Sequence, residues 1–132
     1  RAARQRWSRE RVRSIIEEYP IPTCADKQLV GVGGTVTTLA ALVQGLSVYD
    51  QECVHGSRLK LEQIAAIYNS LAVLSVEQRC AFSLLLKERG EIIIEGIIIL
   101  QEFMKKLSQQ SIIVSDSGIL AGILLNNTCT KL

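Results

Sequence analysis

The sequence predicts an α/β fold that is rich in helices and has few strands. Helical patterns alternate with two short apolar segments, residues 28–32 and 111–115, that are typical of buried strands. Each segment runs straight into a turn of small residues, Gly33-Gly34 in the first case and Asp116-Ser117-Gly118 in the second, and then into another helical pattern. Two strands do not complete a sheet, so we expect this chain to be part of a larger α/β domain whose other strands lie upstream.

The N-terminal region is expected to form a helix over residues 2–18, with one side apolar. Pro20 and Pro22 end this helix, because proline has no amide hydrogen and holds the residue before it in an extended conformation. Arg1 stands where a complete protein would begin with methionine, so we expect the chain to start within a longer protein.

The middle of the chain contains four further helical patterns and one polar connection, residues 47–60. The expected helices cover residues 35–46, residues 61–74, a short segment from Ser75 to about Leu86, and residues 88–107. The last of these is nearly hydrophobic all round near Gly96, which is typical of a central buried helix.

The C-terminal region is expected to contain the strand 111–115, a helix over 119–125 and a tail, 126–132, that carries no pattern and frays. At 132 residues the chain has room for one hydrophobic core. We therefore expect a single domain fragment, in which residues 1–22 form the first helix and its connection and residues 23–125 form the α/β body.

Composition narrows the classes of function. Aromatic residues make up only 5% of the chain, which argues against single-stranded nucleic-acid binding by base stacking. The formal charge is +2, but residues 1–13 carry six arginines against one glutamate. Such a basic arm fits either a phosphate-rich ligand, nucleic acid included, or the solvated face of a terminal helix, and the solvated face is the preferred interpretation.

The four cysteines lie far apart and the chain has a single histidine, so the sequence predicts neither a zinc site nor a disulfide framework. The N-terminus has no apolar segment of the kind found in secretory signals. The most apolar run, residues 92–100, is too short to span a bilayer. We expect a soluble protein of a reducing cytoplasm, with no membrane partner.

The best local signal for chemistry is the glycine turn in residues 29–39, LVGVGGTVTTL. A strand that runs into Gly33, Gly34 and a helix start leaves backbone N–H groups free at the carboxyl edge of a sheet, where they suit a phosphate. Thr35 either caps the helix or offers its hydroxyl to a phosphate oxygen. No lysine follows the glycines, so this is not a Walker A loop. On spacing alone, a tight packing corner explains the turn equally well.

Other candidates are weaker when taken alone. Asp116 suits either a cleft carboxylate that binds a metal or a helix cap, and the cap is favoured. His55 is expected to make a structural hydrogen bond, since no acid or cysteine partner is near it in sequence. Arg58 fits a phosphate contact or a solvent-exposed position equally. Arg89 and Glu91 open the apolar helix, where Glu91 suits the helix dipole and both residues are able to pair with a neighbouring loop.

Taken in order, these segments resemble the Ppx/GppA phosphatase family of the actin-like ATPase superfamily. The matching segments are Gly31 to Thr35 with the Ala/Leu helix behind it, Tyr49-Asp50 ahead of Val54-His55-Gly56, Arg58-Leu59 ahead of an amphipathic helix, Arg89 and Glu91 opening an aliphatic helix that contains Gly96, and Val114 to Gly118 with Gly122 in register. Leu120 and Ala121 depart from the Arg-Glu pair that the family often has after the last turn, which leaves open whether full activity is retained.

The resemblance implies a partial ribonuclease H-like fold, in which residues 23–125 are the C-terminal half of the second actin-like lobe. It implies a two-lobed, homodimeric parent that hydrolyses terminal phosphoanhydride bonds of polyphosphate or guanosine pentaphosphate, with Mg²⁺ as cofactor. The family's catalytic glutamate and its first phosphate loops lie upstream, in an N-terminal lobe that is missing here. The resemblance therefore implies no catalytic residue and no metal ligand in this chain, which should be inactive alone, and gives the Gly33–Thr35 turn the role of one phosphate-contacting wall.

Two other functions remain open at this point. The chain could be a non-catalytic phosphate- or nucleotide-binding module of the actin-like fold that dimerises through its isoleucine-rich helix. The third possibility, nucleic-acid binding through residues 1–13, is the least favoured.

Overall fold

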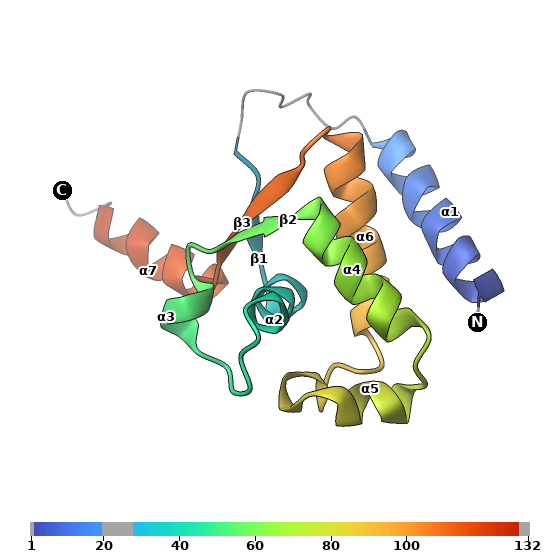
Figure 1. Cartoon of the computed structure of the whole chain (residues 1–132). Coiled ribbons are helices and arrows are strands. Elements are labelled where there is room, and N and C mark those ends of the chain that lie inside the picture. The colour runs from blue at the N-terminus through green and yellow to red at the C-terminus, as the bar shows by residue number, and fades with distance from the viewer. Residues whose placement is uncertain (1, 20–27, 130–132) are drawn as a thin grey trace.

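The computed structural model describes residues 2–19 and 28–129, with the side chains of residues 128 and 129 left out (Figure 1). Its elements are α1 (Ala2–Glu18), β1 (Val30–Val32), α2 (Gly34–Val43), α3 (Gln51–Val54), β2 (Arg58–Lys60), α4 (Leu61–Ala72), α5 (Val76–Phe82), the 3-10 helix η1 (Leu84–Leu86), α6 (Ile93–Lys106), β3 (Ser111–Ser115) and α7 (Ile119–Cys129). The predicted helix-rich α/β organisation is confirmed. The connection expected at Pro20 and Pro22 lies outside the described residues.

The described strands form one three-stranded sheet in the order β1-β3-β2. β3 is central and lies parallel to β1 and antiparallel to β2. Both strands expected from the sequence are present, but β2 was missed inside the polar connection. Its pattern is one apolar residue between two charged ones, with Leu59 buried at 1% exposure and the flanking side chains outside. So short an alternation carries little signal until β3 is there to pair with it.

The polar connection also contains a one-turn helix that the sequence analysis missed. The Asp50 carboxylate accepts hydrogen bonds from the amides of Glu52 at 2.9 Å and Cys53 at 3.4 Å, which caps α3. An aspartate with no apolar periodicity behind it is as common in a turn as at a helix start, so the local pattern could not decide between them.

The predicted helix 88–107 begins later than expected, at Ile93. Residues 87–92 form turns, in which the Ile92 amide donates to the Arg89 carbonyl at 3.0 Å. The segment expected from Ser75 to about Leu86 is broken at Ser83, whose extended backbone separates α5 from η1. Ser75 caps α5 as expected, with its hydroxyl accepting from the Gln78 amide at 3.2 Å.

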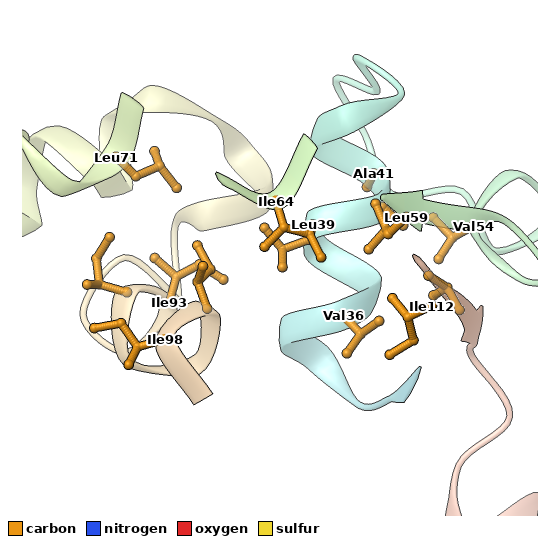
Figure 2. Packing of buried hydrophobic residues seen from close by; sticks show 14 of the residues in the cluster. Val36, Leu39, Ala41, Val54, Leu59, Ile64, Leu71, Ile93, Ile98 and Ile112 are labelled. Carbon is orange, nitrogen blue, oxygen red and sulfur yellow. The ribbon is translucent and has the colours of Figure 1, made fainter. Parts of the chain in front are cut away.

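The core forms around α2, which is flanked by the sheet, α4 and α6. Leu39, Ala40 and Ala41 of α2 have no exposed surface. Leu39 lies close to Ile64 of α4, and Ile93 of α6 belongs to the same buried cluster (Figure 2). The small side chains of Ala40 and Ala41 let the neighbouring elements pack closely on α2, which holds its N-terminal turn in a fixed position against the sheet.

The N-terminal helix α1 lies beside α6 (Figure 1), and ion pairs join the two helices. Glu102 of α6 is only 4% exposed, and its carboxylate accepts from Arg9 at 2.9 Å and from Arg13 at 2.6 Å. Arg4 pairs with Glu95 at 3.1 Å. The preferred interpretation of the basic arm as a solvated face fits Arg4 and Arg13, whose side chains are 75% and 55% exposed, but not Arg9, which is 22% exposed because α1 packs on α6 there.

The last helix extends away from the rest of the structure (Figure 1). Ile119 is 82% exposed and Leu120 is 79% exposed. The helix continues to Cys129, so the expectation that residues 126–132 fray is wrong for 126–129. Over residues 2–19 and 28–129, no helix is both long enough and apolar enough to cross a membrane.

Candidate phosphate-contacting site

A cavity of about 530 Å³ lies where β1 and β3 end. Because these strands are parallel, their carboxyl ends share one edge of the sheet, which is where α/β proteins bind ligands. The cavity brings together Gly33 and Gly34 after β1, Asp116 after β3, and Arg89 from the turn before α6. Four residues predicted separately from the sequence therefore lie around one space.

The glycine turn presents the start of α2 to this cavity. Gly33 is the N-cap, with φ of 93° and ψ of 169°. The first α-helical bond runs from the Thr37 amide to the Gly33 carbonyl at 3.2 Å. The amides of Gly34, Thr35 and Val36 precede that bond, so the positive end of the helix lies at the turn.

Replacing Gly33 by alanine is expected to lower the free energy of unfolding by about 1–3 kcal/mol, because its combination of φ and ψ is almost restricted to glycine. A Cβ at this position would meet nothing within 4 Å, so the cost comes from the backbone alone. Chemical denaturation of the two proteins measures the difference. An equally stable alanine variant would show that the turn can relax.

Arg89 provides the strongest positive charge in the cavity. Its half-buried guanidinium lies directly against Gly34, so that a Cβ on Gly34 would collide with it. Among the described residues, no carboxylate forms an ion pair with Arg89. A guanidinium without a counterion beside the start of a helix favours an anion, and phosphate accepts both kinds of donor.

Asp116 is held in place by two residues from the 47–60 connection. The Tyr49 hydroxyl donates to the Asp116 carboxylate at 2.8 Å, and the Asp116 amide donates to His55 Nδ1 at 3.1 Å. Burial raises the pKa of Tyr49, and its bond to Asp116 raises it further. The Tyr49 hydroxyl therefore remains protonated as a donor at neutral pH. His55 makes a structural hydrogen bond of the kind expected from the sequence.

Besides His55, three predicted residues do not contribute side chains to the cavity. Thr35 packs against α6, where a Cβ on Gly96 would lie 2.5 Å from its Oγ1, so the expectation that its hydroxyl reaches a phosphate here is not met. Arg58 donates to Ser111 at 2.9 Å on the sheet. Glu91 is exposed in the turn before α6 and does not line the cavity.

Sequence reasoning missed the roles of Tyr49 and Thr37. Thr37 lines the cavity, and its hydroxyl donates to the Gly33 carbonyl at 3.3 Å, which fixes the turn. Tyr49 stands 67 positions from its partner Asp116. A threonine one turn into a helix that begins at glycine is a signal that could have been used. No local sequence pattern indicates the role of Tyr49.

The described side chains give no support for metal binding. In residues 2–19 and 28–129, no group of three or more His, Cys, Asp or Glu side chains is placed to hold a metal ion. Asp116 is the one carboxylate among the described cavity-lining residues. The donor set therefore does not fit a resident Mg²⁺.

Comparison with known proteins extends over nearly the whole chain. Residues 2–130 match the model of the Ppx/GppA phosphatase family. Exopolyphosphatase 2 of Mycobacterium tuberculosis is 29% identical over 126 residues, which cover 92% of this chain and 39% of that protein. The bifunctional 3-dehydroquinate synthase/phosphatase of Fusobacterium nucleatum is 33% identical over 103 residues, covering 78% of this chain and 15% of that protein.

The fold matches as well. The crystal structure of the Aquifex aeolicus member of the Ppx/GppA family superposes with a TM-score of 0.88 at 28% identity, covering 96% of this chain and 40% of that one. The chain thus spans about two-fifths of the length of such relatives. The expected fold class, a partial ribonuclease H-like domain of the actin-like superfamily, is confirmed. This chain belongs to the Ppx/GppA phosphatase family.

Proposed function

We propose that this chain forms one phosphate-contacting wall in the cleft of a phosphatase that hydrolyses terminal phosphoanhydride bonds of polyphosphate or guanosine pentaphosphate. The family is that of phosphatases, and a relative is an exopolyphosphatase. The chain supplies the wall, and the upstream lobe of a longer parent supplies the group that activates water. The chain alone is then inactive.

The observation that carries this proposal is the position of Arg89 beside the first turn of α2, in a cavity at the carboxyl ends of two parallel strands. A phosphate oxygen placed between them would accept from the guanidinium and from backbone amides of the turn. Fixed donors of this kind neutralise the charge that gathers on a transferring phosphoryl group, and they need no rearrangement during the reaction.

Mg²⁺ belongs to the proposal only for the parent protein, where it would supply positive charge to the phosphate groups of the substrate. The described residues do not gather the ligands for it. The functions of Arg89 and of the glycine turn are therefore derived without it.

The direct test uses the longer parent protein. Its release of phosphate from long-chain polyphosphate and from guanosine pentaphosphate should be measured with and without Mg²⁺. We expect release that requires Mg²⁺, and we expect none from residues 1–132 alone. A folded parent that releases no phosphate from either substrate would refute the proposal. The ratio of the two rates would identify the substrate.

A second candidate function is a non-catalytic module that dimerises through α6. It is favoured by the exposure of this apolar helix, with Ile99 at 48% and Phe103 at 38%. It predicts that the parent self-associates through α6, so that Ile99→Lys weakens the dimer in sedimentation, and that no phosphate is released. Release of phosphate by the parent protein would favour the phosphatase over the non-catalytic module.

A further inference from the structure

Arg89 and Asp116 carry opposite charges in the same cavity, but they do not pair. Both side chains are half-buried and line the space at the ends of β1 and β3. An arginine and a carboxylate that meet form strong charge-assisted hydrogen bonds, and a partly buried site screens their attraction less than bulk water does. Among the described residues, Arg89 nevertheless has no ion pair with a carboxylate. The two charged groups are therefore held apart within one site.

The hydroxyl of Tyr49 binds one of these two groups. It donates to Asp116 Oδ1 at 2.8 Å, and no other described residue donates a hydrogen bond to this carboxylate. The pKa of Tyr49 is raised by burial and by the bond to Asp116, while a hydrogen bond with Thr37 and the charge of Arg89 act to lower it. The hydroxyl thus lies within reach of both charges in the cavity, and it holds the negative one.

The backbone on the Asp116 side of this hydrogen bond is also fixed. The Asp116 amide donates to His55 Nδ1 at 3.1 Å. The next residue of the connection, Gly56, donates its amide to the Val114 carbonyl of β3 at 2.8 Å. Loss of the Tyr49 hydroxyl therefore releases the carboxylate, whereas the turn that carries Asp116 keeps its own hydrogen bonds.

We propose that Tyr49 is a positioning residue, whose hydroxyl restrains Asp116 and so keeps the Arg89 guanidinium free to bind an anion. Without the hydroxyl, the carboxylate turns to Arg89, and a phosphate group then has to displace it. The inference rests on the proposed function in one respect, since it takes phosphate as the anion that Arg89 binds.

Titration calorimetry of the parent protein with inorganic triphosphate, in the absence of Mg²⁺, measures this effect. We expect Tyr49→Phe to raise the dissociation constant about 10-fold, because the carboxylate now competes with the anion for the guanidinium. Adding Asp116→Asn to that variant should restore the constant to within about threefold of the wild type, because a neutral amide competes far less. A purely structural loss at Tyr49 would not be restored by a change in its partner.

Tyr68→Phe is the matched control. The Tyr68 hydroxyl donates to Gln5 at 3.2 Å, between α4 and α1 and outside the cavity, so its removal should change the dissociation constant by less than about twofold. Equal affinity in the wild type and in Tyr49→Phe, or a loss that Asp116→Asn does not restore, would overturn the positioning role and leave the proposed function standing. A folded wild-type parent that binds no triphosphate would refute the proposed function and this inference together.

Discussion

Gly34→Ala in the parent protein is expected to lower kcat/KM for phosphate release by roughly 10- to 100-fold, the effect of losing one charge-assisted hydrogen bond to the substrate. Alanine suits the first position of α2, but its Cβ would occupy the space of the Arg89 guanidinium. That group is the end of a flexible side chain and swings aside at little cost. The substitution therefore moves Arg89 without unfolding the turn, and steady-state kinetics with a melting curve measures both effects.

A double-mutant cycle shows whether displacement of Arg89 causes the fall in kcat/KM. Arg89→Ala should cost about as much as Gly34→Ala, and the double variant should lose little more than either, since both remove the same contact. Arg79→Ala is the matched control, because it deletes an arginine outside the cavity. Fully additive losses, or Gly34→Ala with normal activity, would exclude Arg89 from the phosphate site.

Glu102→Gln is expected to lower the free energy of unfolding by about 2–3 kcal/mol at pH 7, somewhat less than for a fully buried ion pair, because Arg13 is largely exposed. The substitution keeps the shape of the side chain but removes the carboxylate with which Arg9 and Arg13 pair. Most of this destabilisation comes from Arg9, because its side chain is only 22% exposed. Its guanidinium carbon also lies over the Tyr68 ring, 4.7 Å from the ring centroid. Urea denaturation of the two proteins gives the difference.

The stability difference caused by Glu102→Gln is also expected to depend on pH. Burial acts to raise the pKa of Glu102, but hydrogen bonds from Arg13 and Arg9 outweigh it and lower the pKa below its ordinary value of 4.5. A carboxyl group with a lowered pKa stabilises the fold above its unfolded pKa, and the contribution is lost as the pH falls through the folded value. The stability difference from Glu102→Gln should therefore be constant near neutrality and shrink below about pH 4.5.

The control for Glu102 is Glu62→Gln. Glu62 is 76% exposed and pairs with Lys60 at 3.7 Å, so its loss should cost less than about 0.5 kcal/mol. If both substitutions cost the same, or if the effect of Glu102→Gln persists at pH 3, the ion pairs do not hold α1 against α6.

Most of the regular elements could be predicted because their signals are local. Helix α4 has apolar residues at helical spacing, and β3 is an apolar segment next to a turn. The misses share one cause. β2 has a single apolar residue and needs β3 beside it, and the break at Ser83 is one residue long. Neither leaves a periodic pattern that a sequence can show.

In the candidate site, too, the residues with a local sequence pattern were predicted and those that depend on distant contacts were not. Gly33 and Gly34 were found because a strand, two glycines and a helix in that order restrict what the backbone can do. The direction of the Thr35 side chain could not be predicted, since it depends on Gly96 of α6, which makes room for it. Tyr49 was missed because its partner lies on a distant segment.

The sequence by itself determined most of the helices, the glycine turn and the family of this protein, because each depends on residues close together in the chain or on their order along it. The tertiary structure alone decided that Arg89 lies against Gly34, that Tyr49 holds Asp116, and that Arg9 of α1 pairs with Glu102 of α6. Those contacts join residues from separate elements. They exist only once the core around Leu39 has packed the helices and the sheet into one arrangement.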